Sequence, residues 1–530
     1  MTTAEPITVP HHPTSPALVP PAYAAVSGAV GAAVALGSSE LIAGVLPGAV
    51  SLVASVGQTV IDLQPPGAKD LVVALFGTND KLAFQLLIVG VALVFGAILG
   101  IVARRSYPAA AIGFAAFGLL GFLAALGDPL AQPVMVAATA FVAVALGLET
   151  LSWLLGRAPL ENGSGAAEAI AARDASRRGF LVGSGTIGLA AIGAGWAGRW
   201  LIERQLVAPA GNAEPVPPPG EIVAPLAPGT DLATTVDGLT PIVMPNDRFY
   251  RIDTALLVPV VDAATWSLRI HGLVERETTL TWSELIGLPL FEQYVTIACV
   301  SNEVGGDLVG NAKWTGVRLR EVLDLAGVLP SATQLVGRSV DGWTAGMPTA
   351  WVMDPQREPM IAVLMNDEPL PPRHGYPARL IVPGLFGYVS ATKWLSDLEL
   401  TTLEGFDGFW IPRGWAKEAP ILTQSRIDTP TASSQHPAGT LPVAGIAWAP
   451  DRGVSRVEVE VDGTWRDARL SAPISDTTWV QWLVDWDATA GDHQIRVRAT
   501  DGAGATQPEQ RSPPAPDGAR GWHTISVHID

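Results

Sequence analysis

The sequence predicts a multi-domain chain: an N-terminal α-helical transmembrane bundle, then an α+β domain, then an immunoglobulin-like β-sandwich. Three observations carry this prediction. Long apolar runs dominate the first third, short strand-like and helix-like runs fill 236–415, and strict apolar–polar alternation marks 436–530. The 530 residues leave room for about three domains of ordinary size.

The bundle is expected within 22–158, after a disordered tail at 1–21. Hydrophobic residues make up 48% of the chain and its mean hydropathy is +0.31, which is high for a wholly soluble protein. The segment 51–77 is interrupted by Asp62 and two prolines, which favours an interfacial or re-entrant piece over a span. The apolar runs long enough for a membrane span start near Ala22, Lys81, Tyr107, Pro133 and Phe180.

Positive charges set the expected orientation, because lysine and arginine are retained on the cytoplasmic side of a membrane. Arg104, Arg105, Arg157 and the arginines around Arg177 would be inside. Five spans with a cytoplasmic N-terminus satisfy this pattern and place everything after about Arg204 outside. We therefore expect a multi-pass protein of the cell membrane whose later domains are extracytoplasmic.

The stretch 173–204 combines a transport signal with the last span. The letters "SRRGFL" at 176–181 resemble a twin-arginine motif, and a glycine-rich, weakly apolar segment follows, in which Gly-Ser is expected to break the helix start. Ordinary anchoring arginines would not need the flanking serine and Phe-Leu. The twin-arginine pathway carries folded proteins, so we expect the C-terminal part to hold a cofactor inserted before export.

The remaining chain is expected to form a proline-rich linker and two folded domains. Residues 205–235 are rich in proline and small residues, which is typical of an extended spacer. Within 236–415 no sustained βαβ period appears, which favours an α+β domain. Within 436–530, Val457 and Val459 alternate with charged residues before an Asp462-Gly463 turn, which is typical of a sandwich strand.

Charge and cysteine usage limit the possible functions. The formal net charge of −17 excludes a basic surface large enough for a nucleic-acid partner. Cys299 is the only cysteine, and it lies where an apolar run breaks into a polar, glycine-rich turn, "VTIACVSNEVGG". One cysteine cannot form an internal disulfide or a Cys-only metal site, which leaves an inert buried side chain or a thiolate with a chemical role.

Three blocks carry a family resemblance. "ACVSNEVGGDLVGNAKWTGVRLREVL", "LMNDEPLPPRHGYPARLIVPGLFGYVSATKWL" and "WHTISVHI" resemble the sulfite oxidase family of molybdopterin-dependent oxidoreductases. The likeness runs from about Asn246 to the C-terminus and leaves out the membrane region, as in a membrane-anchored bacterial form. It implies a molybdopterin-binding domain of sulfite oxidase type at 236–415, followed by a dimerisation-type sandwich and hence a homodimer.

The resemblance also implies a molybdenum–pterin dithiolene cofactor with Cys299 as the protein ligand to the metal. A soft thiolate suits a soft, sulfur-bound metal, and metal binding deprotonates it. Arg413 is a further candidate at the pocket mouth. The implied cofactor contacts are Cys299, Asn302, Lys313, Arg318, His374, Arg379 and Lys393, and the implied catalytic residues are Cys299, Arg251, Trp314 and Trp343.

The sequence departs from the sulfite-oxidising pattern at three places. Glu303 and Val304 stand where those members have two arginines, and Trp343 stands where they have an active-site tyrosine. Asp253 replaces the histidine that follows the pocket arginine. A lost cation and a gained carboxylate weaken binding of a small dianion, because charge interactions are strong at low dielectric. We therefore expect two-electron oxygen-atom transfer on a small substrate of another kind, such as a sulfoxide.

Electrons must pass to a separate partner, a cytochrome or a quinone. None of the eight histidines lies in an expected span, and one cysteine cannot hold an iron–sulfur cluster, so the sequence predicts neither haem nor cluster. Glu40 and Glu149 lie in or near spans, where carboxylates are costly. Two interpretations are open for these carboxylates. They have a role with protons or a quinone, or they form hydrogen bonds that pack the helices together.

Two other function classes stay open on the sequence. Cys299 would be the nucleophile of a thiol hydrolase, with His374 as its base. Alternatively, the chain would be a membrane-anchored extracytoplasmic binding protein whose molybdopterin-type domain is inactive.

Overall fold

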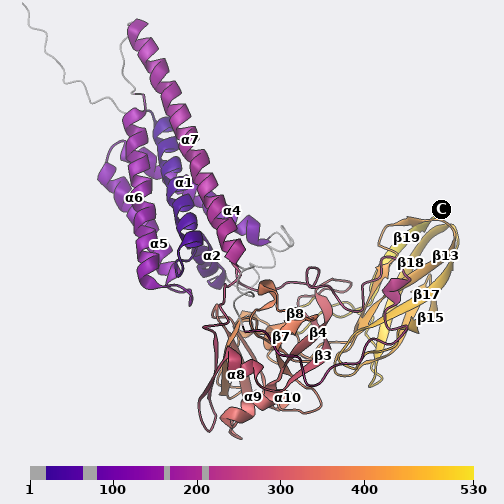
Figure 1. Ribbon diagram of the computed structural model, residues 1–530. Helices are drawn as coiled ribbons and strands as arrows, with labels where there is room; N and C mark the ends of the chain where they lie inside the picture. Colours follow the sequence, from indigo (N-terminus) through magenta and orange to yellow (C-terminus); the bar gives the residue numbers. More distant parts are fainter. Residues whose placement is uncertain (1–18, 64–79, 160–166, 206–213) are drawn as a thin grey trace, which may run out of the picture. The chain divides into compact units, whose positions relative to one another are not determined.

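A computed structural model describes residues 19–63, 80–159, 167–205 and 214–530 of the chain (Figure 1). It divides into two compact units, Met1–Arg204 and Gln205–Asp530, which we describe in turn. Three regions discussed from the sequence lie outside the described residues. They are the expected disordered tail up to residue 18, the two prolines after Asp62, and the first part of the expected linker.

The first unit is helical. Five of its described helices are long and apolar enough to cross a membrane, and they correspond to the five expected apolar runs. Helix α2 has 11 residues, too few to span a bilayer, and its N-cap Ser51 accepts a hydrogen bond from the Ala54 amide. The helices are α1 Pro21–Val45, α2 Leu52–Asp62, α4 Asp80–Ala103, α5 Tyr107–Ala125, α6 Pro133–Arg157 and α7 Ala167–Gln205.

Glycines let helix α1 pack closely against three neighbours. A Cβ atom added at Gly28 would lie 2.0 Å from the Gly96 carbonyl oxygen of α4, and one at Gly37 would lie 2.2 Å from the Ala191 oxygen of α7. Gly31 and Gly147 of α6 approach each other in the same way. Small residues are the usual means by which membrane helices bring their backbones together. Helix α1 is therefore the centre of this unit.

Helix α7 differs from the expected last helix. It runs for 39 residues from Ala167, so the backbone stays helical through the paired arginines and through Gly183-Ser184. The alanine-rich stretch before Ser176 favours helix, which extends the element upstream. Arg177 and Arg178 are exposed, and Ser176 Oγ donates to the Arg157 carbonyl oxygen at 3.2 Å.

The two carboxylates expected near spans have different surroundings. Glu40 is buried on α1 and accepts hydrogen bonds from Ser51 Oγ at 2.7 and 2.9 Å. This bond ties α1 to the start of α2, which is a helix-packing role. Glu149 on α6 is exposed.

The second unit begins with two sheets, the first antiparallel and the second mixed, with one parallel pair between β1 and β10 (Figure 1). One has the strand order β3-β4-β7-β8, with β9 also paired to β7, and the other has the order β2-β1-β10-β5-β6. Their strands are β1 Ser267–Gly272, β2 Thr278–Thr281, β3 Leu290–Ala298, β4 Val309–Arg318, β5 Gln334–Ser339, β6 Thr344–Pro348, β7 Met360–Met365, β8 Glu368–Pro369, β9 Arg379–Ile381 and β10 Leu395–Thr401.

Short helices connect these strands. Helix α8 begins with a capping box between Thr281 and Glu284, and α9 follows β4 directly with an amphipathic pattern. No long βαβ repeat occurs in the described part, as the α+β expectation requires. The helices are α8 Trp282–Ile286, α9 Leu319–Ala326, α10 Thr349–Val352 and α11 Gly387–Ser390, with 3₁₀ turns η3 Leu232–Thr234, η4 Pro372–His374 and η5 Ile411–Arg413.

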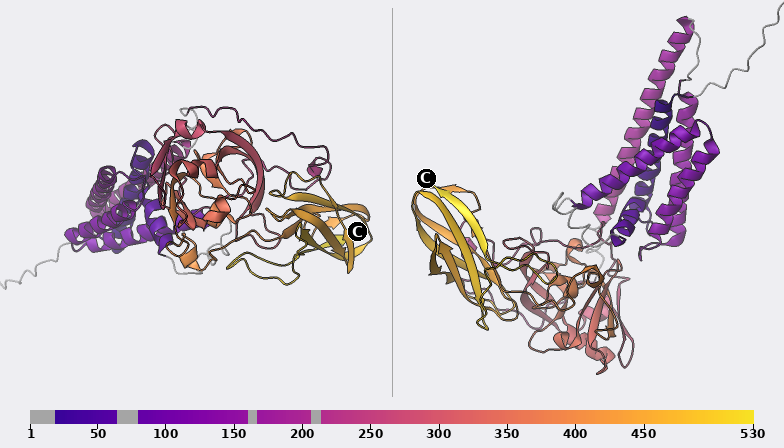
Figure 2. Two further views of the ribbon diagram at one scale, coloured as in Figure 1. Left: turned by 90° about the horizontal axis from the view of Figure 1, so that it is seen from below. Right: turned by 180° about the vertical axis from the view of Figure 1, so that it is seen from behind.

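The C-terminal region consists of two sheets around one apolar core (Figure 2). Their strand orders are β11-β13-β17-β16 and β12-β19-β18-β14-β15. The immunoglobulin type of this β-rich region stays a prediction. The strands are β11 Gln424–Thr429, β12 Gln435–His436, β13 Gly439–Trp448, β14 Val454–Val461, β15 Thr464–Asp467, β16 Arg469–Leu470, β17 Val480–Ala488, β18 Gly491–Asp501 and β19 His523–Ile529.

From Val457 to Val461, strand β14 is buried on both faces. Val457 and Val459 enter the core, as the alternation predicts, but the intervening Glu458 is also buried. Arg498 pairs with Glu458 at 2.8 Å, and its guanidinium lies 4.1 Å from the centre of the Trp465 ring. A paired arginine covered by an aromatic ring allows a carboxylate to leave water, so alternating polarity here does not mean alternating exposure.

The α+β and two-sheet regions share a hydrophobic core. Trp448 and Trp479 of the two-sheet region belong to the same buried cluster as the α+β strands. Trp479 Nε1 donates to the Ile242 carbonyl oxygen, and its backbone amide donates to Thr296 Oγ1 on β3, both at 2.8 Å. The two regions are therefore packed together rather than joined by a flexible hinge.

The described part of the expected linker also belongs to this fold. Glu221 forms a parallel bridge with Phe291 of β3, and the Leu232 amide donates to Gln481 Oε1 of β17 at 2.6 Å. Leu232 is buried against the two-sheet region. Residues 214–235 therefore lie along the folded unit and do not act as a free spacer.

Candidate functional site

The single cysteine follows β3 in a tight turn. Cys299 is 8% exposed, its amide donates to the Leu308 carbonyl oxygen at 2.9 Å, and its own carbonyl accepts from the Asn302 amide at 3.1 Å. The thiol sulfur lies 2.9 Å from Ser301 Oγ. The β3–β4 hairpin thus fixes the backbone on both sides of the sulfur.

Residues of the two-sheet region hold the far side of this turn. Gly305 has φ of +84°, and a Cβ there would lie 2.3 Å from the His523 ring of β19, so only glycine fits. Arg426 Nη1 donates to the Gly306 carbonyl oxygen at 2.9 Å. Within the turn, Asn302 Oδ1 accepts from the Leu308 amide at 2.9 Å. The position of the cysteine loop therefore depends on strands from both regions.

His374, Arg379 and Lys393 come together from three neighbouring segments. They lie on η4, at the start of β9 and between α11 and β10, and all are at most 9% exposed. Arg379 Nη1 donates to the His374 carbonyl oxygen at 3.0 Å. Gly375, with φ of +112°, lets this segment approach Lys393, because a Cβ there would lie 3.0 Å from the Lys393 Cα.

Burial shifts the pKa values of all three side chains. Desolvation, together with the charges of Lys393 and Arg379, lowers the pKa of His374 to about 3, so this imidazole is neutral at pH 7. Desolvation also lowers the pKa of Arg379 to about 10 and that of Lys393 to about 8, the latter against the attraction of Asp253. His374 Nε2 lies 3.1 Å from the Asn246 carbonyl oxygen, so Nε2 carries the proton and Nδ1 is an acceptor.

Three buried polar atoms in this area have no hydrogen-bond partner among the described residues. They are Asn302 Nδ2, His374 Nδ1 and Arg379 Nε. Buried polar groups are normally satisfied, because an unmade hydrogen bond costs about 1–3 kcal/mol. A set of two donors and one acceptor, on the cysteine turn and on the neighbouring basic cluster, fits a polar, sulfur-ligated cofactor.

Lys393 also belongs to a second charged group, formed with Arg251 and Asp253, which we call the charged wall. Arg251 Nε and Nη2 donate to the two carboxylate oxygens of Asp253 at 2.8 and 3.3 Å, and Lys393 Nζ donates to Asp253 Oδ2 at 3.2 Å. The Arg251 side chain is 29% exposed, whereas those of Asp253 and Lys393 are 6% and 10% exposed. Arg251 is therefore the member of this group that faces solvent.

The two predicted pocket tryptophans have different positions. Trp314 on β4 is fully buried, its Nε1 donates to the Val295 carbonyl oxygen, and the Arg379 guanidinium lies 5.2 Å from its ring centre. It supports the basic residues from the core. Trp343 is half-buried in the β5–β6 turn, where its amide donates to Asp341. Burial and the nearby charge of Asp253 raise the pKa of Asp341, which places this turn close to the charged wall.

Tyr250 is a site residue that the sequence reasoning missed. Burial, and to a lesser extent Cys299, raise its pKa, while Arg379 opposes that change, so the phenol is electrostatically coupled to both residues. Its ring stacks on Phe249, which makes an edge contact with His374. The sequence offered an indication of this residue, because Tyr250 directly precedes Arg251, the predicted pocket arginine.

Two predicted cofactor contacts lie elsewhere. Lys313, in the middle of β4, pairs with Glu292 and Asp367 at 3.1 and 2.6 Å. Arg318 ends β4, at the far end of the β3–β4 hairpin from Cys299, because Ala298 pairs with Val309 in this register.

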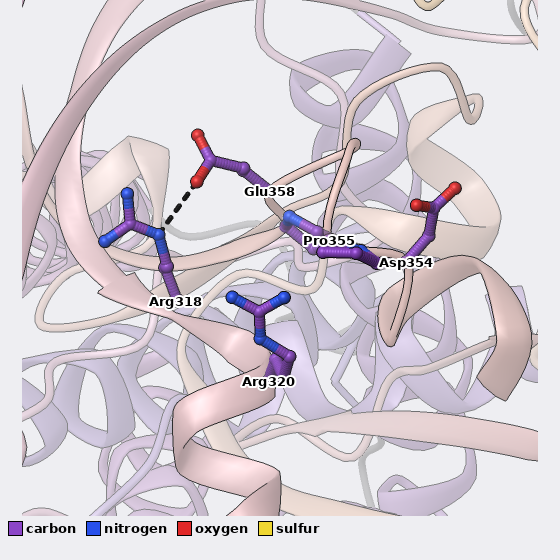
Figure 3. A pocket seen from close by; sticks show the side chains of 6 residues that line it. Arg318, Arg320, Asp354, Pro355 and Glu358 are labelled. Atoms are coloured by element: carbon purple, nitrogen blue, oxygen red, sulfur yellow. Dashed lines mark hydrogen bonds and ion pairs between the residues drawn. The ribbon is translucent and has the colours of Figure 1, made fainter.

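Ion pairs engage the Arg318 guanidinium. It pairs with Glu221 at 2.7 Å and with Glu358 at 2.9 Å, beside Arg320 and Asp354 (Figure 3). The structure does not bring Arg318 or Lys313 to the cysteine.

The predicted pocket-mouth residue Arg413 contacts its own turn. Its guanidinium stacks on the Phe409 ring at 3.7 Å and donates to the Phe409 carbonyl oxygen, so it folds back onto that turn.

Comparison with known proteins identifies the domain around this site. Residues 255–410 match the family described as "Oxidoreductase molybdopterin binding domain". Nitrate reductase [NADH] 1 of Oryza sativa subsp. japonica is 30% identical over 319 residues, 48% of this chain and 34% of that protein. Mitochondrial sulfite oxidase of Homo sapiens is 28% identical over 342 residues, 54% of this chain and 62% of that protein. The chain thus spans about a third of the first and less than two thirds of the second.

Among solved structures, the sulfane dehydrogenase SoxCD from Paracoccus pantotrophus resembles 54% of this chain and 81% of its own, with 23% identity and a TM-score of 0.48. The sequence relatives and the family match show that the chain carries a molybdopterin-binding oxidoreductase domain with sulfite oxidase and nitrate reductase homologues.

Proposed function

We propose that this chain, which carries a molybdopterin-binding oxidoreductase domain, is a membrane-anchored molybdenum enzyme that transfers an oxygen atom to or from a small substrate. The observation that supports it best is the set of three unpartnered polar atoms, on Asn302, His374 and Arg379, in the site around the buried Cys299 thiol. When bound, the cofactor would supply the two-electron oxygen-atom transfer chemistry.

The residues of the chain would hold this cofactor in defined ways. Cys299 would ligate molybdenum through its thiolate, a soft ligand suited to a soft metal. Asn302 Nδ2 and Arg379 Nε would donate, and His374 Nδ1 would accept, hydrogen bonds with the polar parts of the pterin. Lys393 would add positive charge for its phosphate. Lys313 and Arg318, which form ion pairs with neighbouring carboxylates, stay predicted contacts of the cofactor at a greater distance from the cysteine along β4.

The substrate side would be formed by Arg251, Tyr250 and Trp343. Arg251 is partly exposed and would orient an oxygen of the substrate, while the Trp343 ring would form a wall. The electrons would pass to or from a separate haem protein or quinone. We further propose that the five long helices anchor the protein in the cell membrane, with the catalytic unit outside after twin-arginine export.

The thiol-hydrolase alternative has an electrostatic difficulty. A base with a pKa of about 3 does not take a proton from a thiol at neutral pH, and His374 already donates Nε2–H to Asn246. Thiol-reactive probes distinguish the two, because a free nucleophile is labelled readily and a metal-bound thiolate is not.

The proposal is tested by the metal content of the full chain. We expect about one molybdenum and one pterin per chain when the protein is made in a host that synthesises the cofactor, with loss or catalytic silencing in Cys299→Ser. Ser301→Ala is the matched control, because it alters the hydrogen-bond partner of the same sulfur without removing the ligand. A folded wild-type protein without molybdenum contradicts the enzyme and supports a membrane-anchored binding protein.

A further inference from the structure

We propose that Asp253 is a specificity-determining residue that restricts the substrate to a neutral oxide, such as a sulfoxide, and disfavours an oxoanion of two negative charges. This inference rests on the proposed function, because it concerns the substrate of the same site.

The position of Asp253 is fixed by two cations. Its two carboxylate oxygens receive both donors of the Arg251 fork, and Oδ2 also receives Lys393 Nζ at 3.2 Å. Lys393 Nζ donates in addition to the Arg373 carbonyl oxygen at 3.2 Å. Since the Asp253 side chain is only 6% exposed, its charge is poorly screened by water and acts mainly on these neighbours.

The charges around Asp253 decide what the pocket can bind. Without Asp253, the side chains of Arg251, Lys393 and Arg379 would present three positive charges, and Asp253 reduces this to two. His374 contributes none, because its imidazole is neutral. Asp341, in the turn before Trp343, adds a further carboxyl close to Asp253, whose charge raises the pKa of Asp341.

A dianion and a neutral oxide respond differently to this arrangement. Sulfite or sulfate would need the Arg251 donors free, whereas the carboxylate of Asp253 competes for these N–H donors and repels the ligand. A sulfoxide needs one donor to its oxygen, which the exposed edge of Arg251 can supply. The reaction is balanced as R₂SO plus two electrons and two protons giving R₂S and water. A haem protein or a quinol supplies the electrons, and the reverse equation describes oxidation.

The test compares ligand binding by the full-length, molybdenum-loaded protein and its Asp253→Asn variant. The probes are sulfate, a dianion, and dimethyl sulfoxide, a neutral oxide, titrated by calorimetry at low ionic strength. We expect the variant to bind sulfate at least about tenfold more tightly, since one charge at short range in a partly buried site is worth that much, and to bind dimethyl sulfoxide within about twofold of wild type. Molybdenum is measured in each sample.

Asp501→Asn is the matched control. It also removes a buried carboxylate from an arginine pair, with Asp501 3% and Arg452 28% exposed, but in the two-sheet region. It changes the net charge equally and should leave both affinities unchanged. If Asp253→Asn does not fold, Asp253→Ser removes the same charge with a smaller side chain, and sulfate must again bind about tenfold more tightly than it binds wild type.

Three results would overturn the inference. Unchanged sulfate binding in a molybdenum-loaded Asp253→Asn protein removes the role of Asp253 and leaves the proposed enzyme standing. If the Asp253→Asn variant binds sulfate and dimethyl sulfoxide more tightly by the same factor, the substitution has widened the pocket and has not acted through charge. Absence of molybdenum from wild type overturns the proposed function itself and the substrate class with it.

Discussion

At the scale of single residues, the site depends on side chains whose charge state is set by burial. His374, Arg379 and Lys393 occur within one sequence block, and the structure brings them together around a turn that Gly375 permits. Their pKa values fall because the segments that carry them cover one another. The charge state of the site therefore results from packing and not from residue type alone.

The buried imidazole of His374 predicts a loss of stability in acid. Its pKa is about 3 in the folded chain and near 6.5 in the unfolded chain, so the unfolded state binds the proton first. Stability from this residue is complete above about pH 6.5 and is lost as the pH falls towards 3. We expect cofactor-free protein to lose about 2 kcal/mol between pH 7 and pH 5 through His374.

The measurement is chemical unfolding at the two pH values, with His374→Gln beside wild type. The variant should show a smaller pH dependence by that amount. His523, whose pKa is lowered to about 4, adds a similar acid sensitivity that wild type and variant both retain. Equal pH dependence in wild type and His374→Gln would contradict the neutral, buried imidazole.

At the scale of elements, the helices are held by backbone contact rather than by large side chains. Helix α1 meets α4, α6 and α7 at glycines, and its carboxylate Glu40 fixes the start of α2. Such contacts tolerate no added atoms, because the neighbouring carbonyl oxygens belong to rigid helices.

Gly28→Val is expected to disrupt the helical unit. The new Cβ would lie 2.0 Å from the Gly96 oxygen, so the helices must separate, at a cost of about 1–3 kcal/mol. Gly188→Val on α7 is the matched control, because nothing lies within 4 Å of its Cβ position. The temperature of aggregation in detergent should fall for the first variant only. A larger fall in aggregation temperature for Gly188→Val than for Gly28→Val would show that α1 is not packed at Gly28.

The same scale shows how far the sequence could predict the structure. The apolar runs correspond to the helices, because a membrane span is set by local composition. Lys313 and Arg318 follow the family pattern in sequence, yet the strand register and their carboxylate partners keep them away from the cysteine. Asp253 pairs with Lys393 across 140 residues, and no local pattern reveals such a contact.

At the scale of the whole molecule, residues 205–530 form one compact unit. Trp448 and Trp479 complete the core of the α+β region, and the described part of the proline-rich segment packs on both regions. The sequence suggested separate domains because the periodicity of the strands changes near 436. Periodicity reports on local elements and does not show whether two regions share a core.

The shared core predicts that the two regions of this unit open together. Amides of β3 and β17 should show matching free energies of opening by hydrogen exchange, because the same tryptophan packs on both. Trp479→Ala should lower both by about 3–5 kcal/mol, the usual cost of truncating a buried tryptophan.

Trp465→Ala is the control for that experiment. This half-buried ring covers Arg498 on the outer face of the two-sheet region, so its loss should affect exchange in β18 and leave β3 unchanged. Independent opening of β17 in the Trp479→Ala protein, with β3 still protected, would contradict a shared core.

The contact of His523 with Gly305 also has a consequence for biosynthesis. The cysteine turn is made first, and the strand that supports it leaves the ribosome more than 200 residues later. Until β19 is in place, the turn lacks the imidazole that covers Gly305, and the Ile427 amide next to Arg426 lacks its acceptor, His523 Nδ1. A nascent chain that lacks β19 therefore cannot present a finished binding site, and loading with any prosthetic group must follow the synthesis of this strand.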